Sequence, residues 1–260
     1  MDMEQKKHFV LVHGACHGAW CWFKIKPLLV AAGHRVTVLD MAASGIDMRP
    51  IQEVQSIVEY SEPLLKALAC VAPNEKVILV GHSLGGINLA VAMEHFPHKI
   101  AASVFLTAFV PDTDHSPSYV LDQYNKQSPA EAWLDTQFCP YGNAAEPLTS
   151  MFFGPNFMAK KLYQLSPPED LELGLNLLRP SSLFIQDLSK AKNFSKEKYG
   201  SVPKVYVVCT EDKAIPKDFQ QWMILNAGIQ NVMEINGADH MAMFSKPREL
   251  LHCLLQIALN

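Results

Sequence analysis

The most constraining feature of the chain is a glycine-flanked serine between two apolar segments. Residues 77–80 are Val-Ile-Leu-Val, which has the length and β-branched content of a buried strand. The turn 81–85 (Gly-His-Ser-Leu-Gly) follows directly, and then a run rich in alanine and large apolar residues favours a helix. Strand, G-x-S-x-G turn and helix together indicate a nucleophile elbow, in which Ser83 projects from a strained backbone.

The glycines of this turn fit the same interpretation. A Cβ at Gly81 or Gly85 is expected to collide with the other arm of the elbow, and Gly86 adds clearance. A phosphate-binding loop is one alternative, but the G-x-x-x-x-G-K-[ST] spacing is missing and no lysine follows the glycines. A turn without chemistry is the other alternative. The strand before the motif and the helix after it favour the nucleophile.

Composition excludes several classes of partner. At 260 residues and 49% hydrophobic, the chain predicts one large domain, or a domain with an insertion, around a sizeable core. A net charge of −4, without a Lys/Arg cluster longer than a pair, argues against nucleic acid and anionic membrane as partners. There is no run of about 18 apolar residues to span a bilayer. The polar start lacks the apolar segment of a secretory signal.

The cysteines point to a reducing compartment. All 6 are scattered without C-x-x-C pairs, so we expect free thiols, a cytoplasmic location and neither a disulfide framework nor structural zinc.

The order of the predicted elements defines an α/β class. Strands and helices alternate outside the middle of the chain, with a bend expected at Pro63. This alternation predicts a mostly parallel sheet with helices on both faces. The expected strands cover 8–14, 34–40, 77–80, 101–109, 204–210 and 232–235. The expected helices cover 15–32, 54–71, 216–227 and 247–259.

The alternation stops between residues 111 and 190. This segment is predicted to form short helices separated by proline and glycine, and it contains many large apolar side chains. A lobe beside a catalytic turn usually covers it, so we expect a helical cap at 111–190 inserted into a core of 1–110 and 191–260. An irregular peripheral lobe is the alternative.

A serine nucleophile needs a base in contact and an acid that orients the base. In parallel sheets such groups gather at the carboxyl ends of strands. Asp212 follows the strand expected at 204–210, and His240 lies in the loop after the short strand at 232–235. The order Ser83, Asp212, His240 is the one expected for this elbow, and we predict His240 as base and Asp212 as its acid.

Other acids and histidines compete for these roles. Among the carboxylates, Asp112 is the serious competitor because it also follows a strand, whereas Asp239 is too close in the chain to orient its neighbour. The third rival acid is Glu211. Among the histidines, His82 neighbours the serine and is expected to point away from it. His95, His98 and His115 lie in surface-like segments, and His13 and His17 are expected to be structural. A metal pair of His13 and His17 lacks a third ligand.

The oxyanion of such a reaction needs two N–H donors. One is expected from Leu84, the residue after the nucleophile, and the other from Ala15 in the turn after the first strand. Gly14 leaves room for the acyl group to approach that backbone.

These residues carry a family likeness. The chain resembles the plant methylesterase family of α/β-hydrolases over nearly its whole length. The segments that carry the resemblance are 8–20, 39–45, 81–86, 180–184, 199–202, 209–212 and 237–243.

The resemblance implies an α/β-hydrolase fold and hydrolysis of methyl esters of small plant-hormone acids, such as methyl salicylate, methyl jasmonate and methyl indole-3-acetate. It implies the same three catalytic residues, no cofactor, the ester and its free acid as ligands, and a homodimer as in many members. It also implies a substrate pocket from Ala15, Leu84, Phe109, Tyr124, Trp133, Phe138, Met151, Phe153, Leu183 and Met241.

Two alternative functions remain open at this stage. Hydroxynitrile lyases similar to this chain carry Thr in place of Gly14 and Lys in place of Met241. A lysine beside the base would stabilise departing cyanide, which methionine cannot do, so the sequence departs from the lyases at both positions. A hormone-binding receptor with little turnover could use the same pocket.

Overall fold

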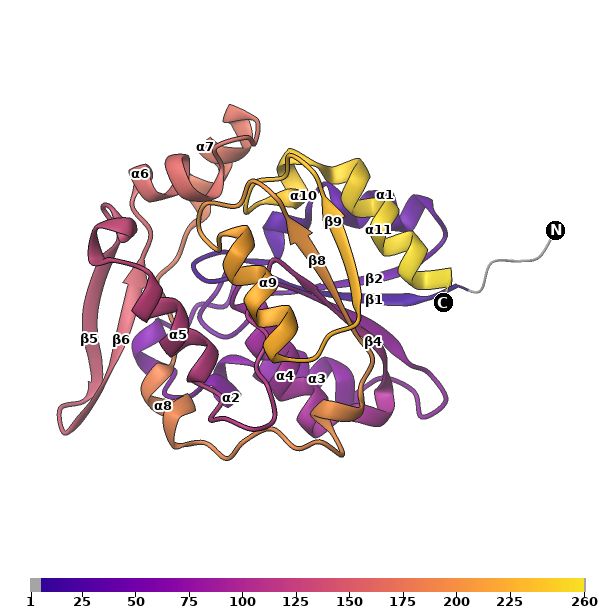
Figure 1. Cartoon of the computed structure of the whole chain (residues 1–260), viewed down its shortest axis with the longest axis horizontal. Coiled ribbons are helices and arrows are strands. Elements are labelled where there is room, and N and C mark those ends of the chain that lie inside the picture. The colour runs from indigo at the N-terminus through magenta and orange to yellow at the C-terminus, as the bar shows by residue number, and fades with distance from the viewer. Residues whose placement is uncertain (1–5, 260) are drawn as a thin grey trace.

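The computed structural model describes residues 6–259 and contains a central sheet of six strands, all paired in parallel. The predicted α/β alternation is therefore confirmed (Figure 1). In spatial order the strands are β2 (Arg35–Leu39), β1 (His8–Val12), β3 (Val77–His82), β4 (Ile100–Leu106), β8 (Lys204–Cys209) and β9 (Asn231–Ile235).

Inner strands of this sheet are buried on both sides. Every residue of β1 and β3 is buried, which explains why both read as continuous apolar runs rather than as alternating patterns. Helices α1 (Ile25–Ala31) and α11 (Pro247–Leu259) pack together over one face, and α3 (Glu62–Ala69) and α4 (Gly85–His95) lie over the other (Figure 1). The remaining core helices are α2 (Ile57–Tyr60), α9 (Lys217–Asn226) and α10 (Ala242–Ser245). Within residues 6–259, no helix combines the length and apolar character needed to cross a bilayer.

Two predicted helices are shorter than expected. The segment 15–32 forms a 3₁₀ turn, Ala19–Trp22, followed by α1 alone. The segment 54–71 is divided into α2 and α3 at Ser61, and Pro63 occupies the first turn of α3. Proline is tolerated there because its missing N–H would have no helical partner in any case. Instead of one helix bent at Pro63, the chain therefore forms two helices that are separated at Ser61, just before the proline.

The segment 111–190 differs from the purely helical expectation. It contains α5 (Tyr119–Gln127), α6 (Pro155–Phe157), α7 (Pro168–Leu177) and α8 (Ile185–Lys190), but also a second, antiparallel sheet. The strands of this sheet are β5 (Gln137–Asn143), β6 (Glu146–Phe152) and β7 (Ser181–Ser182). The prediction of a helical insertion is wrong in this respect.

The hairpin of β5 and β6 was not predicted from the sequence because each of its strands contains a proline. Pro140 lies in β5, which is an edge strand and therefore tolerates a missing donor. Pro147 lies in β6, but β7 pairs only with Ser150 and Met151 farther along that strand. The hairpin turn also lacks the usual Asn-Gly pair. Asn143 closes it instead by accepting a hydrogen bond from the N–H of Ala145.

The elements of the inserted segment gather beyond the carboxyl ends of the parallel strands (Figure 1). Hydrogen bonds connect this segment to the core at several places. The hydroxyl of Tyr163 bonds to Nε2 of His17 at 2.8 Å, and Asp239 accepts from the N–H of Leu165 and the hydroxyl of Ser166, both at 2.9 Å. The insertion is thereby positioned over the edge of the sheet where the candidate site lies.

Candidate active site

The predicted elbow is present around Ser83. Strand β3 ends at His82 and α4 begins at Gly85, so two residues make the whole change of direction. Ser83 has φ +56° and is half-buried. A non-glycine residue in this left-handed region is uncommon and frequently marks a functional position. The N–H of Phe109 donates to the Ser83 carbonyl at 3.0 Å, which holds the strained turn.

The glycines are required by close backbone approach, though not always to the expected neighbour. A Cβ on Gly81 would lie 2.8 Å from the carbonyl oxygen of Gly85, as expected for the two arms of the elbow. A Cβ on Gly85 would instead meet the carbonyl of His13 at 2.8 Å, in the turn after β1. A Cβ on Gly86 would lie 2.1 Å from the carbonyl of Phe109. The elbow is therefore packed against both neighbouring strands.

Asp212 and His240 come together beside this turn. Nδ1–H of His240 donates to Oδ2 of Asp212 at 2.6 Å, and both side chains are buried. The hydroxyl of Thr107 donates to the same oxygen at 2.5 Å. The other oxygen, Oδ1, accepts from the N–H groups of Ala214 and Ile215 at 2.7 and 2.8 Å. Four donors thus compensate the buried carboxylate. Because Nδ1 of His240 carries the proton donated to Asp212, Nε2 of a neutral His240 carries none.

Thr107 was missed by the sequence analysis. The strand was expected to run to residue 109, which placed Thr107 inside it, whereas β4 ends at Leu106. Its position could have indicated a role, because Thr107 follows directly after the strand next to the elbow strand. Functional residues of parallel sheets gather at such carboxyl ends of strands.

The rival acids have other partners. Asp112 accepts from His115 and Asn226, with its Oδ2 2.8 Å from Nδ1 of His115. Asp239 connects its own loop to the inserted segment through Ser166 and the N–H of Leu165. Glu211 is exposed.

The neighbouring histidines are held as neutral structural groups. His82 donates from Nε2 to the carbonyl of His240 at 2.8 Å, and burial keeps the pKa of His82 well below its usual range. His13 bonds through Nδ1 to the carbonyl of Gly14 and accepts through Nε2 from the N–H of Met41. His17 bonds to the carbonyl of Ala15 and to Tyr163. Within residues 6–259, no group of three or more His, Cys, Asp or Glu side chains is placed to hold a metal ion.

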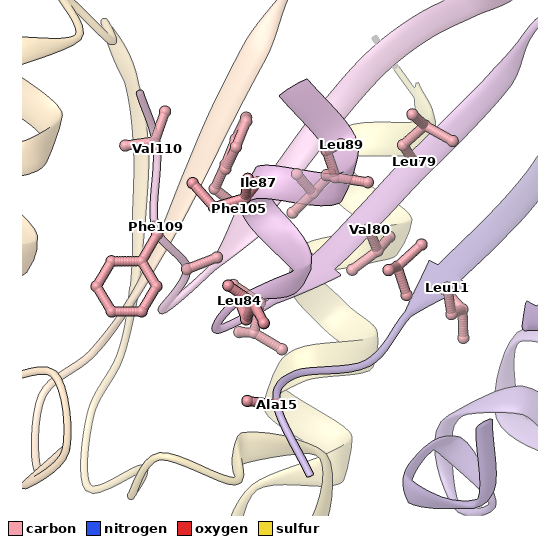
Figure 2. Close-up of a cluster of buried hydrophobic side chains, with 14 of the residues drawn as sticks. Leu11, Ala15, Leu79, Val80, Leu84, Ile87, Leu89, Phe105, Phe109 and Val110 are labelled. Atoms are coloured by element: carbon pink, nitrogen blue, oxygen red, sulfur yellow. The ribbon is translucent and has the colours of Figure 1, made fainter. Parts of the chain in front are cut away.

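Ser83 and His240 open onto one small apolar cavity of about 30 Å³. Eight of the residues predicted for the oxyanion hole and the pocket line it. They are Ala15, Leu84, Phe109, Tyr124, Trp133, Met151, Phe153 and Leu183. Figure 2 shows Ala15 and Leu84 on adjacent turns, with Phe109 beside Leu84. The two expected N–H donors therefore belong to residues that border the same cavity as the serine.

A second cavity of about 390 Å³ lies outside the first. Trp133, Met151 and Leu183 line both cavities, so these three side chains, called the partition below, lie where the two cavities adjoin. The predicted pocket residue Phe138 lines the outer cavity. Met241 is fully buried and lines neither cavity, which corrects its expected place in the pocket. Gly14 borders the nucleophile, because a Cβ there would lie 2.8 Å from the Cβ of Ser83.

Comparison with known proteins agrees with this geometry. Residues 9–252 match the alpha/beta hydrolase family. The chain is 61% identical to salicylic acid-binding protein 2 of Nicotiana tabacum, over 98% of each protein. It is also 61% identical to methylesterase 1 of Arabidopsis thaliana, over 99% of this chain and 98% of the other. The crystal structure of polyneuridine aldehyde esterase matches with a TM-score of 0.95 at 52% identity, covering 98% of this chain and 100% of that one.

A parallel sheet with a serine at such an elbow defines the class of α/β-hydrolases. The chain belongs to the plant methylesterase family of these hydrolases and is a carboxylic ester hydrolase.

Proposed function

We propose that this protein is a serine carboxylesterase that hydrolyses methyl esters of small plant-hormone acids to the free acid and methanol. The observation that carries the proposal is that Ser83 and His240 line the same apolar cavity, while Nδ1 of His240 bonds to Asp212. The names of its relatives, a salicylic acid-binding protein and a methylesterase, support an ester of this kind as substrate.

In the proposed reaction, Nε2 of His240 takes the proton of Ser83 as the serine oxygen attacks the ester carbonyl. Asp212 accepts from Nδ1–H of His240, which fixes the tautomer with a free Nε2 and stabilises the imidazolium that forms. N–H groups of Ala15 and Leu84 receive the oxyanion. Methanol leaves with the proton from His240, and water then releases the acid by the same steps in reverse order.

The size of the inner cavity bears on how the ester binds. At about 30 Å³ the inner cavity is far smaller than a typical ligand pocket of roughly 300–1,000 Å³, so a ring-containing acyl group is expected to fit only if the lining side chains move. In the proposed binding mode, the acyl group passes Trp133, Met151 and Leu183 and extends toward the outer cavity, which these three side chains also line. Methyl salicylate, methyl jasmonate and methyl indole-3-acetate are the proposed substrates.

Neither alternative function is favoured by the site. The lyase reaction would need a threonine near the nucleophile, but a Cβ at Gly14 would lie 2.8 Å from the Cβ of Ser83 and 3.1 Å from Nδ1 of His82 in this backbone. The position of the lyase lysine is taken by Met241, which is fully buried. A receptor role needs the acid to be retained after a single turnover.

The proposal includes a cytoplasmic homodimer. All six cysteines are free thiols, which suits a reducing compartment, and the family resemblance supports the dimer. Sedimentation of the purified protein would give a single species of twice the chain mass if the dimer is correct.

A panel of methyl esters, assayed for kcat/KM with mandelonitrile cleavage as the lyase control, tests the proposed function. Steady turnover of at least one hormone ester over many cycles, without cyanide release, is the expected result. A single burst followed by tight retention of the acid would instead support the receptor, and cyanide release would support the lyase.

A further inference from the structure

Thr107 occupies the junction between the elbow and the acid of the site. It follows β4 directly, and its N–H donates to the carbonyl of Val207 in the neighbouring strand at 2.9 Å. On the other side, the N–H of Ser83 donates to the carbonyl of Leu106 at 3.4 Å. Thr107 is fully buried. The chain leaves the sheet at this residue and turns toward the nucleophile.

The backbone of Thr107 is strained. Its φ is +36°, and for a β-branched residue such a value is a genuine outlier. If only the turn mattered, glycine or asparagine would adopt this conformation with less strain. Threonine at such a position therefore points to a use of the side chain, because strain of this kind is concentrated at functional sites.

The hydroxyl is aimed at the carboxylate that orients the base. Thr107 Oγ1 donates to Oδ2 of Asp212 at 2.5 Å, a length typical of a hydrogen bond to an ionised oxygen. The same Oδ2 accepts from Nδ1–H of His240 at 2.6 Å. Because two N–H groups hold Oδ1, the hydroxyl completes a fixed arrangement in which the carboxylate cannot rotate and exchange its oxygens.

We propose that Thr107 is a positioning residue of the hydrolytic reaction, which acts through Asp212 on the orientation and basicity of His240. This inference rests on the proposed triad. The hydroxyl stabilises the ionised carboxylate and shares the oxygen that faces the imidazole, so its loss alters both the geometry and the charge that His240 experiences.

The test is a comparison of Thr107→Val and Thr107→Ser. Valine keeps the β-branched shape but cannot donate, whereas serine keeps the donor. Thr107→Val is expected to lower kcat about 10–100-fold with KM changed less than about two-fold, the loss typical of a hydrogen bond to a charged group. Thr107→Ser is expected to stay within about three-fold of the parent in kcat.

The pH profile separates positioning from simple loss of stability. Removing a neutral donor leaves more negative charge facing the imidazole, so the acid limb of kcat/KM is expected to move to higher pH in Thr107→Val. Ser103→Ala is the matched control. Ser103 is a buried residue of the same strand whose hydroxyl has no partner among the described residues, so its removal is expected to leave both kcat and the limb unchanged.

The role of Thr107 would be overturned if Thr107→Val kept kcat within about two-fold of the parent and the acid limb of its kcat/KM profile did not move. If the valine variant fails to fold, Thr107→Ser and Thr107→Ala are compared instead, and equal kcat values would overturn it. Ser83→Ala is assayed in parallel. Full hydrolysis by that variant contradicts the proposed triad, whereas an inactive Ser83→Ala beside a fully active Thr107→Val contradicts only the role of Thr107.

Discussion

At the scale of the residue, partners and burial decide which acidic and histidine side chains have chemical roles. Asp212 and Asp112 both follow strands of the sheet, yet only Asp212 bonds to a histidine that shares a cavity with Ser83. Chain order and the carboxyl-end rule were enough to predict Ser83, Asp212 and His240 as partners. They could not identify Thr107, because a strained φ and a shared acceptor oxygen are properties of three-dimensional structure.

Asp212→Asn is expected to lower kcat by roughly 10³–10⁴-fold with little change in KM, because an amide favours the wrong tautomer of His240. Steady-state kinetics on a methyl ester measure the effect. Asp112→Asn is the control, since Asp112 bonds to His115 and Asn226, and its kcat is expected to stay near that of the parent. A large loss in Asp112→Asn with an active Asp212→Asn would assign the acid to the rival residue.

His17 makes the stability of the protein depend on pH. Burial lowers the pKa of His17 from 6.5 to about 3, so the unfolded chain binds this proton more readily than the native one. The native state is therefore expected to lose stability as the pH falls from about 6.5 toward 3, and to keep it above that range. Urea unfolding at about pH 7 and about pH 4.5 measures the difference.

Replacing His17 with Gln is expected to destabilise the protein near neutral pH, through the lost bond to Tyr163, but to reduce the dependence on pH. His98→Gln is the control, because His98 is exposed. An unchanged pH dependence in His17→Gln would show that the proton is taken up elsewhere.

At the scale of the element, strands and helices with strong patterns were predictable, and those interrupted by proline were not. The elbow strand and the terminal helix lie where the pattern indicated, with α11 at Pro247–Leu259. The hairpin of β5 and β6 was missed because its prolines are tolerated only by a particular pairing, which the sequence does not reveal. That hairpin carries Met151 of the partition.

The partition between the two cavities is expected to limit bulky esters. Leu183→Ala removes a half-buried side chain that lines both cavities, so kcat/KM for methyl jasmonate relative to p-nitrophenyl acetate is expected to rise about 10-fold. Leu165→Ala is the control, since Leu165 belongs to the same inserted segment but is 50% exposed. An unchanged ratio in Leu183→Ala would mean that the ester does not pass this wall.

At the scale of the whole molecule, the site exists only where the sheet and the insertion meet. Ser83 and His240 come from the core, whereas Tyr124, Trp133 and Met151 come from the segment between residues 111 and 190. The fold class and the order of the catalytic groups could be predicted, because both follow from local patterns and chain order. The shape and volume of the cavities could not, because they depend on the packing of side chains from distant parts of the chain. The division into core and cap remains a prediction.

The most direct test is multiple turnover of a methyl ester by the parent protein and by Ser83→Ala, with Ser201→Ala as an exposed-serine control. A fluorophosphonate probe and mass spectrometry would locate the covalently labelled residue in the same samples. The account predicts labelling at Ser83, steady turnover by the parent and Ser201→Ala, and a loss of several orders of magnitude in Ser83→Ala. Ordinary hydrolysis by Ser83→Ala, or labelling at another residue, would contradict it.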